Sequence, residues 1–135
     1  MCEVVVATAL LALAIVSLAE LVGIAVVANR HARDTTYATV LAFQKIEELR
    51  GAAYTDLAAS PPGALDQNTA GCVDFLDERG SVLGAGSMPV GTVYIRRWSI
   101  DPIAVQAGGA LALQVVVTTL RNVRTARLVA VRNAP

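Results

Sequence analysis

The sequence predicts an α+β fold, in which one long N-terminal helix packs on a small antiparallel β-sheet. The first observation is that residues 2–50 contain no proline and a single glycine, Gly23. One helix of about 50 residues is therefore expected, whereas helices of globular proteins average about 11–12 residues. The second observation is that the chain after residue 71 alternates β-branched and apolar segments with turns that contain glycine or proline, which is typical of sheets.

The first part of the predicted helix, residues 1–28, has the composition of a membrane span. Between Val4 and Ala28 the only charged side chain is Glu20. About 25 residues with a rise of about 1.5 Å each make a rod of about 37 Å, which exceeds the hydrocarbon thickness of about 30 Å. In lipid such a segment has to be helical, because its backbone groups find no other partners. Glu20 is expected to extend toward the outer interface, or to bond to a partner chain.

The second part of the helix, residues 29–53, is predicted to be amphipathic. Side chains at steps of three and four residues form a stripe that is expected to pack under a sheet. This stripe consists of Ala38, Ala42, Ile46, Leu49 and Ala53. The opposite side is mixed, and in an assembly it is where a neighbouring subunit would make contact. Its members are Tyr37, Leu41, Gln44, Glu47 and Glu48.

The remaining residues, 54–135, are predicted to form a loop followed by strands. Residues 54–71 contain the sequence SPPG at 60–63, whose prolines exclude a helix or a central strand. Four strands are expected, at residues 72–76, 91–100, 110–119 and 126–132. The pair Asp101-Pro102 is expected to end the second strand. The last three strands are expected to form an antiparallel meander with one face on the helix stripe.

No motif in the sequence predicts catalysis, a metal site or a cofactor. We find no nucleophile–base pair, phosphate-binding loop or CxxC motif, and we expect the protein not to be an enzyme. The formal net charge is +0 and the longest basic run is Arg96-Arg97, so nucleic acid is not indicated as a partner. Because side chains alternate along a strand, this pair is expected to be a solvated edge rather than an anion site.

The two cysteines, Cys2 and Cys72, are not expected to form a disulfide. Cys2 would lie at the edge of the membrane and Cys72 in the domain outside it, which is beyond disulfide reach. Cys72 opens an apolar strand candidate. A buried free thiol is therefore expected there.

The first 50 residues resemble the type IV pilin and pseudopilin family. Residues 3–15, EVVVATALLALAI, are similar to the family's glutamate followed by an apolar run. Residues 42–50, AFQKIEELR, are similar to the end of the long helix in many minor pilins. Only Met1 and Cys2 precede Glu3, where family precursors carry a short basic leader. We interpret Met1 as a residue inside the mature segment, which puts the prepilin-peptidase site and the N-methylated residue outside this numbering.

The resemblance implies a minor pilin or pseudopilin, a structural subunit assembled through its N-terminal helix. The filament would be a type IV pilus, a type II secretion pseudopilus or a DNA-uptake apparatus. Glu3 would neutralise the terminal ammonium of a neighbouring subunit, since a carboxylate at the edge of an apolar segment is costly to bury unpaired. The implied partners are other pilin or pseudopilin subunits, the inner membrane, prepilin peptidase and the assembly platform. The subunit would cross the bacterial inner membrane once, with its head outside the cytoplasm, before it enters the filament.

Two other interpretations remain open at this stage. One is a single-pass, signal-anchored extracytoplasmic binding domain that does not polymerise. The other is a secreted β domain cleaved after Ala28, because residues 26–28 are compatible with a processing site. Incorporation into a filament distinguishes a pilin from the first, and an intact N-terminal helix in the mature protein excludes the second.

Overall fold

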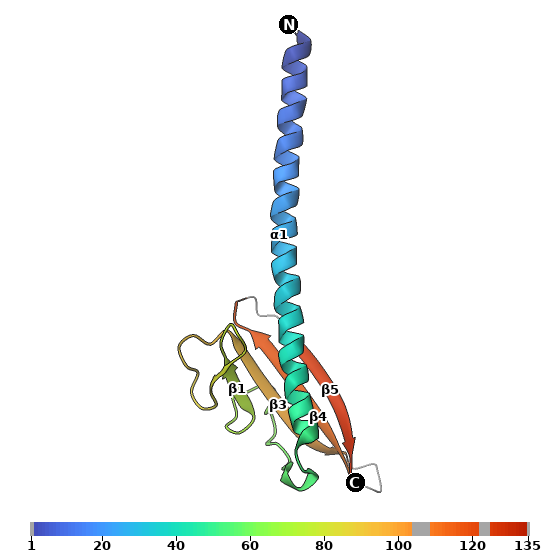
Figure 1. The fold of residues 1–135 in the computed structure, drawn as a ribbon, viewed down its shortest axis with the longest axis vertical. Coiled ribbons are helices and arrows are strands. Elements are labelled where there is room, and N and C mark those ends of the chain that lie inside the picture. Colours follow the sequence, from blue (N-terminus) through green and yellow to red (C-terminus); the bar gives the residue numbers. More distant parts are fainter. Residues whose placement is uncertain (1, 104–108, 122–124, 135) are drawn as a thin grey trace. The chain divides into compact units, whose positions relative to one another are not determined.

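A computed structural model describes residues 2–103, 109–121 and 125–134 (Figure 1). It contains helix α1 (Cys2–Gly51), the short 3-10 helix η1 (Tyr54–Asp56) and strands β1 (Val73–Leu76), β2 (Val82–Gly84), β3 (Tyr94–Ile103), β4 (Ala110–Thr119) and β5 (Thr125–Asn133). The predicted α+β fold is confirmed, because one long N-terminal helix packs on an antiparallel sheet. Contacts divide the chain into two units. We call the residues up to Arg33 the N-terminal segment and the residues from Asp34 onward the head.

Helix α1 ends two residues before the predicted boundary. Ala53 is expected in the packed stripe, and this expectation is wrong: its backbone is extended (φ −64°, ψ 143°) and its side chain is exposed. The last turn is closed instead by Arg132, whose Nη1 donates to Leu49 O (3.0 Å) and Ala52 O (2.7 Å). The guanidinium thus supplies the hydrogen-bond donors that the backbone of a further helical turn would otherwise provide.

The strand order in the sheet is β2-β1-β3-β4-β5, and all neighbours are antiparallel. The predicted meander is confirmed: β3 pairs with β4 from Tyr94 to Ile103, and β4 pairs with β5 from Ala110 to Thr118. Strand β2 is not among the predicted strands. Its three residues are too short to show the alternation that indicates a strand.

The prediction that Asp101-Pro102 ends the second long strand is wrong, because β3 continues to Ile103. Pro102 lies opposite Leu111 of β4. On its other side β3 pairs with β1 only from Tyr94 to Arg97, so within the described residues Pro102 has no strand neighbour there. Proline is tolerated at such edge positions because a ladder bond from its nitrogen is not needed.

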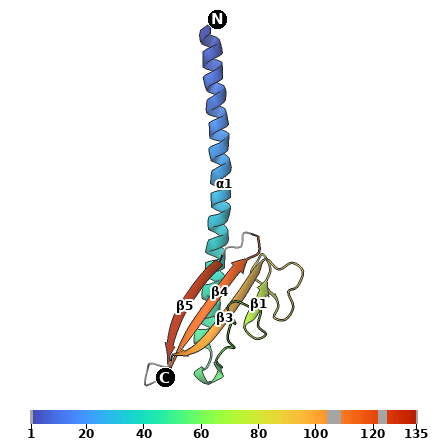
Figure 2. The same ribbon diagram turned by 180° about the vertical axis from the view of Figure 1, so that it is seen from behind.

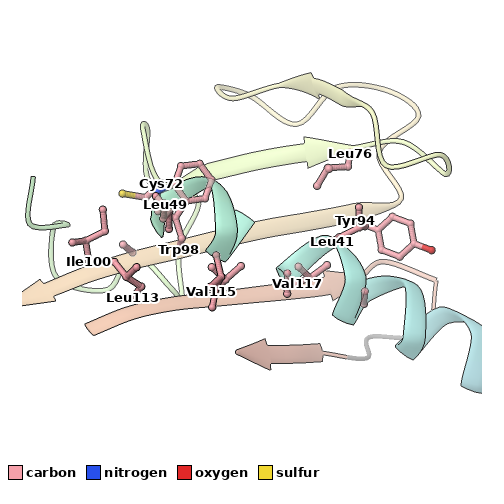
Figure 3. Close-up of a cluster of buried hydrophobic side chains, with 14 of the residues drawn as sticks. Leu41, Leu49, Cys72, Leu76, Tyr94, Trp98, Ile100, Leu113, Val115 and Val117 are labelled. Atoms are coloured by element: carbon pink, nitrogen blue, oxygen red, sulfur yellow. The ribbon is translucent and has the colours of Figure 1, made fainter. Parts of the chain in front are cut away.

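The main core lies between the head part of α1 and the inner face of the sheet. Figures 1 and 2 show α1 crossing one face of the strands and leaving the other face uncovered by the helix. The buried side chains come from α1, from every second residue of β3 and β4, and from β1 and the loop (Figure 3). They are Ala38, Leu41, Ala42, Ile46, Leu49, Ala64, Cys72, Leu76, Tyr94, Trp98, Ile100, Leu111, Leu113, Val115 and Val117.

The outer face of the sheet divides into a covered half and an exposed half. Val73, Phe75 and Ile95 form a second buried cluster on β1 and β3. At the other end of the sheet, Val129 and Val131 of β5 are each 59% exposed. The outer face is therefore apolar at both ends, but buried only at the β1 end.

The predicted loop before the sheet is tied to β3 through Ser60. Ser60 N donates to Ile100 O (2.9 Å), and Ile100 N donates to Ser60 Oγ (3.0 Å). The thiol of Cys72 donates to the same Oγ (3.5 Å). Cys72 is buried and free, as predicted, and Cys2 is exposed and free.

Candidate functional site

The N-terminal segment exposes apolar side chains on all sides of α1. Val4, Leu10, Leu13, Leu21 and Ile24 are 63–67% exposed. A helix that is apolar all round is typical of a membrane span or of the interior of a helical bundle. By length and composition, α1 could cross a membrane.

The hydroxyl groups of the N-terminal segment are satisfied within the helix. Thr8 Oγ1 donates to Val4 O (2.9 Å), and Ser17 Oγ donates to Leu13 O (3.0 Å). A hydroxyl bonded to the preceding turn needs no water, so these residues are compatible with an apolar environment.

Glu3 and Glu20 are both exposed, and the structure does not bring them together. Glu3 lies in the first turn of α1, where the helix dipole favours a negative charge. Glu20 lies about 25 Å further along the axis, on the same side of the helix as Gly23, Val27 and His31. Within the described residues neither carboxylate has an ion-pair partner.

In the head, α1 buries a wider stripe than the one predicted. Ala42, Ile46 and Leu49 are buried, with exposed fractions of 0%, 4% and 8%. Leu41 is expected on the opposite side, and this expectation is wrong, because its exposed fraction is 3%. The buried positions recur at alternating steps of three, one and three residues, which covers a broader arc of the helix than a single row. Lys45 also lies on this arc and is buried.

Three of the other predicted contact residues have partners inside the head, and the fourth, Gln44, is exposed. Tyr37 is half-buried, and its Oη donates to Arg79 O (2.6 Å). Glu47 and Glu48 are exposed; the first accepts from Arg50 (2.9 Å) and the second from Lys45 (2.8 Å).

Two apolar side chains on the solvent side of α1 are absent from the predicted contact set. Val40 is 55% exposed and Phe43 is 58% exposed. They are three residues apart and therefore neighbours on the helix surface. If Leu41 is assigned to the buried arc of α1, Val40 and Phe43 fall on the exposed side of the helix.

A buried group of charges joins α1 to the sheet. Arg96 donates through Nη2 (2.7 Å) and Nε (3.1 Å) to Asp74 Oδ2, and through Nη1 to Leu41 O (3.3 Å). Lys45 Nζ lies 3.7 Å from the same Asp74 oxygen and 4.0 Å from the centre of the Trp98 ring. The exposed fractions of Lys45, Asp74 and Arg96 are 7%, 8% and 4%.

The expectation of a solvated Arg96-Arg97 edge is therefore wrong for Arg96. Strand alternation separates the two: Arg96 points under the helix, and Arg97 donates to Asn68 Oδ1 (2.9 Å) on the other face. Two signals could have revealed the buried group. Lys45 falls within the apolar helix stripe, and Arg96 shares its strand face with Trp98.

The arrangement offers packing surfaces and a structural charge cluster. Among the described residues, no group of three or more His, Cys, Asp or Glu side chains could hold a metal ion. Comparison with protein-family models, curated proteins and solved structures gives no match for this chain. The observations define an α+β protein whose N-terminal helix is long and apolar enough to span a membrane.

Proposed function

We propose that the chain is a minor pilin or pseudopilin, a subunit assembled through its N-terminal helix into a type IV pilus or a type II secretion pseudopilus. The observation that carries this proposal is the divided character of α1. The N-terminal segment exposes apolar side chains all round, whereas residues 38–49 bury one side against the sheet of the same chain. The second part anchors the helix in the head, and the first part offers a surface for lipid or for other helices.

The resemblance of two stretches of the sequence to the pilin family supports the same proposal. Residues 3–15 and 42–50 are similar to the two ends of the family's long helix. They fall at the start of α1 and over its last turns, which bury Ile46 and Leu49.

Glu3 directs assembly in this proposal. A carboxylate that moves from the membrane edge into a bundle of apolar helices remains charged only if a cation pairs with it. The terminal ammonium of a neighbouring subunit supplies that cation, so correct docking neutralises both charges. Val40 and Phe43 then provide further subunit contacts outside the membrane. Before assembly the subunit is held in the inner membrane with its head outside the cytoplasm, and prepilin peptidase and the assembly platform act on it there.

The test compares Glu3→Ala with Glu78→Ala in the full chain, produced in a bacterium that assembles the filament. Glu78 is the control because it is an exposed glutamate outside the apolar run and outside the predicted contact residues. Immunoblots measure the chain in the membrane fraction and in sheared filaments. We expect Glu3→Ala to reach the membrane normally, and to be depleted in filaments by about tenfold or more, as expected for an unpaired partner charge.

Three results would contradict the proposal. Equal incorporation of both variants into filaments would show that Glu3 does not direct assembly. Absence of the unmodified chain from every sheared filament, together with a stable membrane-bound monomer, would favour an anchored binding domain. A mature protein that begins after Ala28 would favour a cleaved, secreted domain.

A further inference from the structure

The outer edge of β5 is a long, unpaired strand edge. β5 has nine residues and pairs with β4 in an unbroken register from Asn133 to Thr125. Within the described residues no strand pairs with its other side. In an antiparallel pair, alternate residues direct their N–H and C=O groups away from the partner. About half of the β5 residues therefore present backbone donors and acceptors outward.

The opposite edge of the same sheet is built differently. β2 has three residues, and its pairing with β1 shifts register between Phe75 and Leu76. Short, irregular strands are a common protection against pairing with another chain, as are edge lysines and prolines. The β5 sequence, TARLVAVRN, contains neither lysine nor proline, and Arg127 is its one exposed charged residue. The protein thus protects one edge of its sheet and leaves the other open.

The side chains of β5 suit strand pairing. Ala126, Leu128 and Ala130 pack against the main core, which holds the strand in place. Val129 and Val131 project from the outer face and are 59% exposed, and β-branched residues pack well against a neighbouring strand. Arg132 does not place a charge at the open edge, because its side chain donates to the carbonyls at the end of α1.

The exposed outer-face side chains of β5 also include Arg127, a cation without an ionic partner. Arg127 Nη2 donates to Gln114 Oε1 across the β4–β5 pair. Within the described residues no carboxylate forms an ion pair with Arg127. A complementary strand would supply that carboxylate beside its β-branched residues. A second copy of β5 would not, because β5 contains two arginines and no acidic residue.

We propose that β5 is a docking edge for an extended strand of another protein, which adds to the sheet as a sixth strand. The partner strand carries β-branched residues that pack on Val129 and Val131, and an acidic residue that pairs with Arg127. Hydrogen bonds to the outward backbone groups of β5 supply affinity, and the side-chain row supplies selectivity. This inference does not depend on filament assembly, because an anchored binding domain would present the same edge.

The test uses the full chain in detergent micelles and a fluorescent peptide as the probe. The peptide has about nine residues and alternates valine with threonine, to match the length and exposed side chains of β5. It carries one glutamate, third from its C-terminal end, which lies opposite Arg127 in a full antiparallel pairing. A control peptide carries N-methyl groups at alternate residues, which block backbone pairing and leave the side chains unchanged. Fluorescence anisotropy measures binding, and Trp98 emission verifies that each variant is folded.

We expect the glutamate peptide to bind and the N-methylated peptide to bind at least about tenfold more weakly. Val129→Lys should also weaken binding about tenfold, whereas Val90→Lys should not, because Val90 is exposed on a loop away from the edge. Arg127→Glu should weaken binding of the glutamate peptide about fivefold and favour a lysine peptide instead.

Each of three outcomes would overturn the proposal. The first is no detectable binding of the glutamate peptide at a peptide concentration of about 1 mM. The second is equal binding of the two peptides, or equal effects of the two lysine substitutions. The third is self-association in analytical ultracentrifugation that Val129→Lys abolishes, since the occupant would then be a second copy.

Discussion

Asp74 and Arg96 lie directly opposite each other on β1 and β3, and their side chains form an ion pair beneath α1. The same guanidinium donates to the backbone carbonyl of Leu41, so one side chain links two strands and the helix. A buried pair of this kind contributes little net stability compared with apolar packing, but removal of one partner leaves an uncompensated charge. The pair therefore restricts how α1 can lie on the sheet.

Asp74→Asn should lower the free energy of unfolding by about 3–5 kcal/mol, because Arg96 then keeps a buried charge without a carboxylate. Urea unfolding of the full chain in micelles, followed by the emission of Trp98, measures the loss. Arg97→Gln is the control, since Arg97 lies on the outer face and should cost less than about 1 kcal/mol. Similar losses of unfolding free energy in both variants would show that the buried Asp74–Arg96 pair has no special effect on stability.

Lys45→Met should be tolerated better than Lys45→Ala. Methionine keeps a long apolar side chain in the core and loses the contact of the ammonium with Asp74 and Trp98, at a cost of about 1 kcal/mol. Alanine also leaves a cavity beneath the helix and should cost about 2 kcal/mol or more. The same unfolding assay compares the two. Equal losses would mean that the charge of Lys45, rather than its packing, stabilises the head.

Gly80→Ala should destabilise the head by about 1–3 kcal/mol. Gly80 has φ +80°, and a Cβ there would lie 2.8 Å from Leu41 Cδ2 and 3.1 Å from Tyr37 Oη. Gly71→Ala is the matched control, since Gly71 has φ +79° and nothing lies within 4 Å of the added carbon. The difference between the two midpoints of thermal unfolding tests this close approach of the turn to α1. No difference would indicate that the turn is free to move away.

Arg132→Met should lower stability by about 1–3 kcal/mol, because the carbonyls of Leu49 and Ala52 lose a charged donor. The loss should appear first as faster amide hydrogen exchange in the last turn of α1. The comparison variant is Arg121→Met, which breaks only the exposed pair with Glu78 (3.1 Å) and should leave the unfolding curve nearly unchanged. Unaltered exchange near Leu49 would argue against a capping role for Arg132.

The head should lose stability as the pH rises above 10.0. Burial, followed by the negative charge of Asp34, raises the pKa of Tyr94 above its ordinary value of 10.0. The folded state therefore retains this proton at a pH where the unfolded state has released it, so deprotonation favours unfolding. Tyr94→Phe should show a shallower decline in stability over the same pH range. Parallel curves for the two proteins would exclude a contribution from Tyr94.

Patterns local in the sequence predict much of the fold. The absence of proline, and of glycine between Gly23 and Gly51, predicts the length of α1 to within two residues. Apolar and β-branched runs predict the three long strands, but not β2, whose three residues are defined only by pairing with β1. Pro102 remains in β3 because β1 stops short of it, which no local pattern indicates.

The candidate site is harder to predict from local sequence patterns. Helical periodicity correctly places Ala42, Ile46 and Leu49 in the core, because burial of an apolar stripe follows from the repeat of the helix. It assigns Leu41 to the wrong side, because the width of the buried arc depends on how the sheet fits around the helix. Val40 and Phe43 become recognisable as exposed residues only when that arc is known.

The sequence by itself determined the two-part helix and the strand-rich head, since both follow from hydrophobic periodicity and from where glycine and proline interrupt it. Only the tertiary structure decided that Asp74, Arg96 and Lys45 meet beneath the helix and that β5 is an open edge. Both depend on strand order and register. Residues far apart in the chain become neighbours through pairing, and a single residue's environment is then set by what packs on its face.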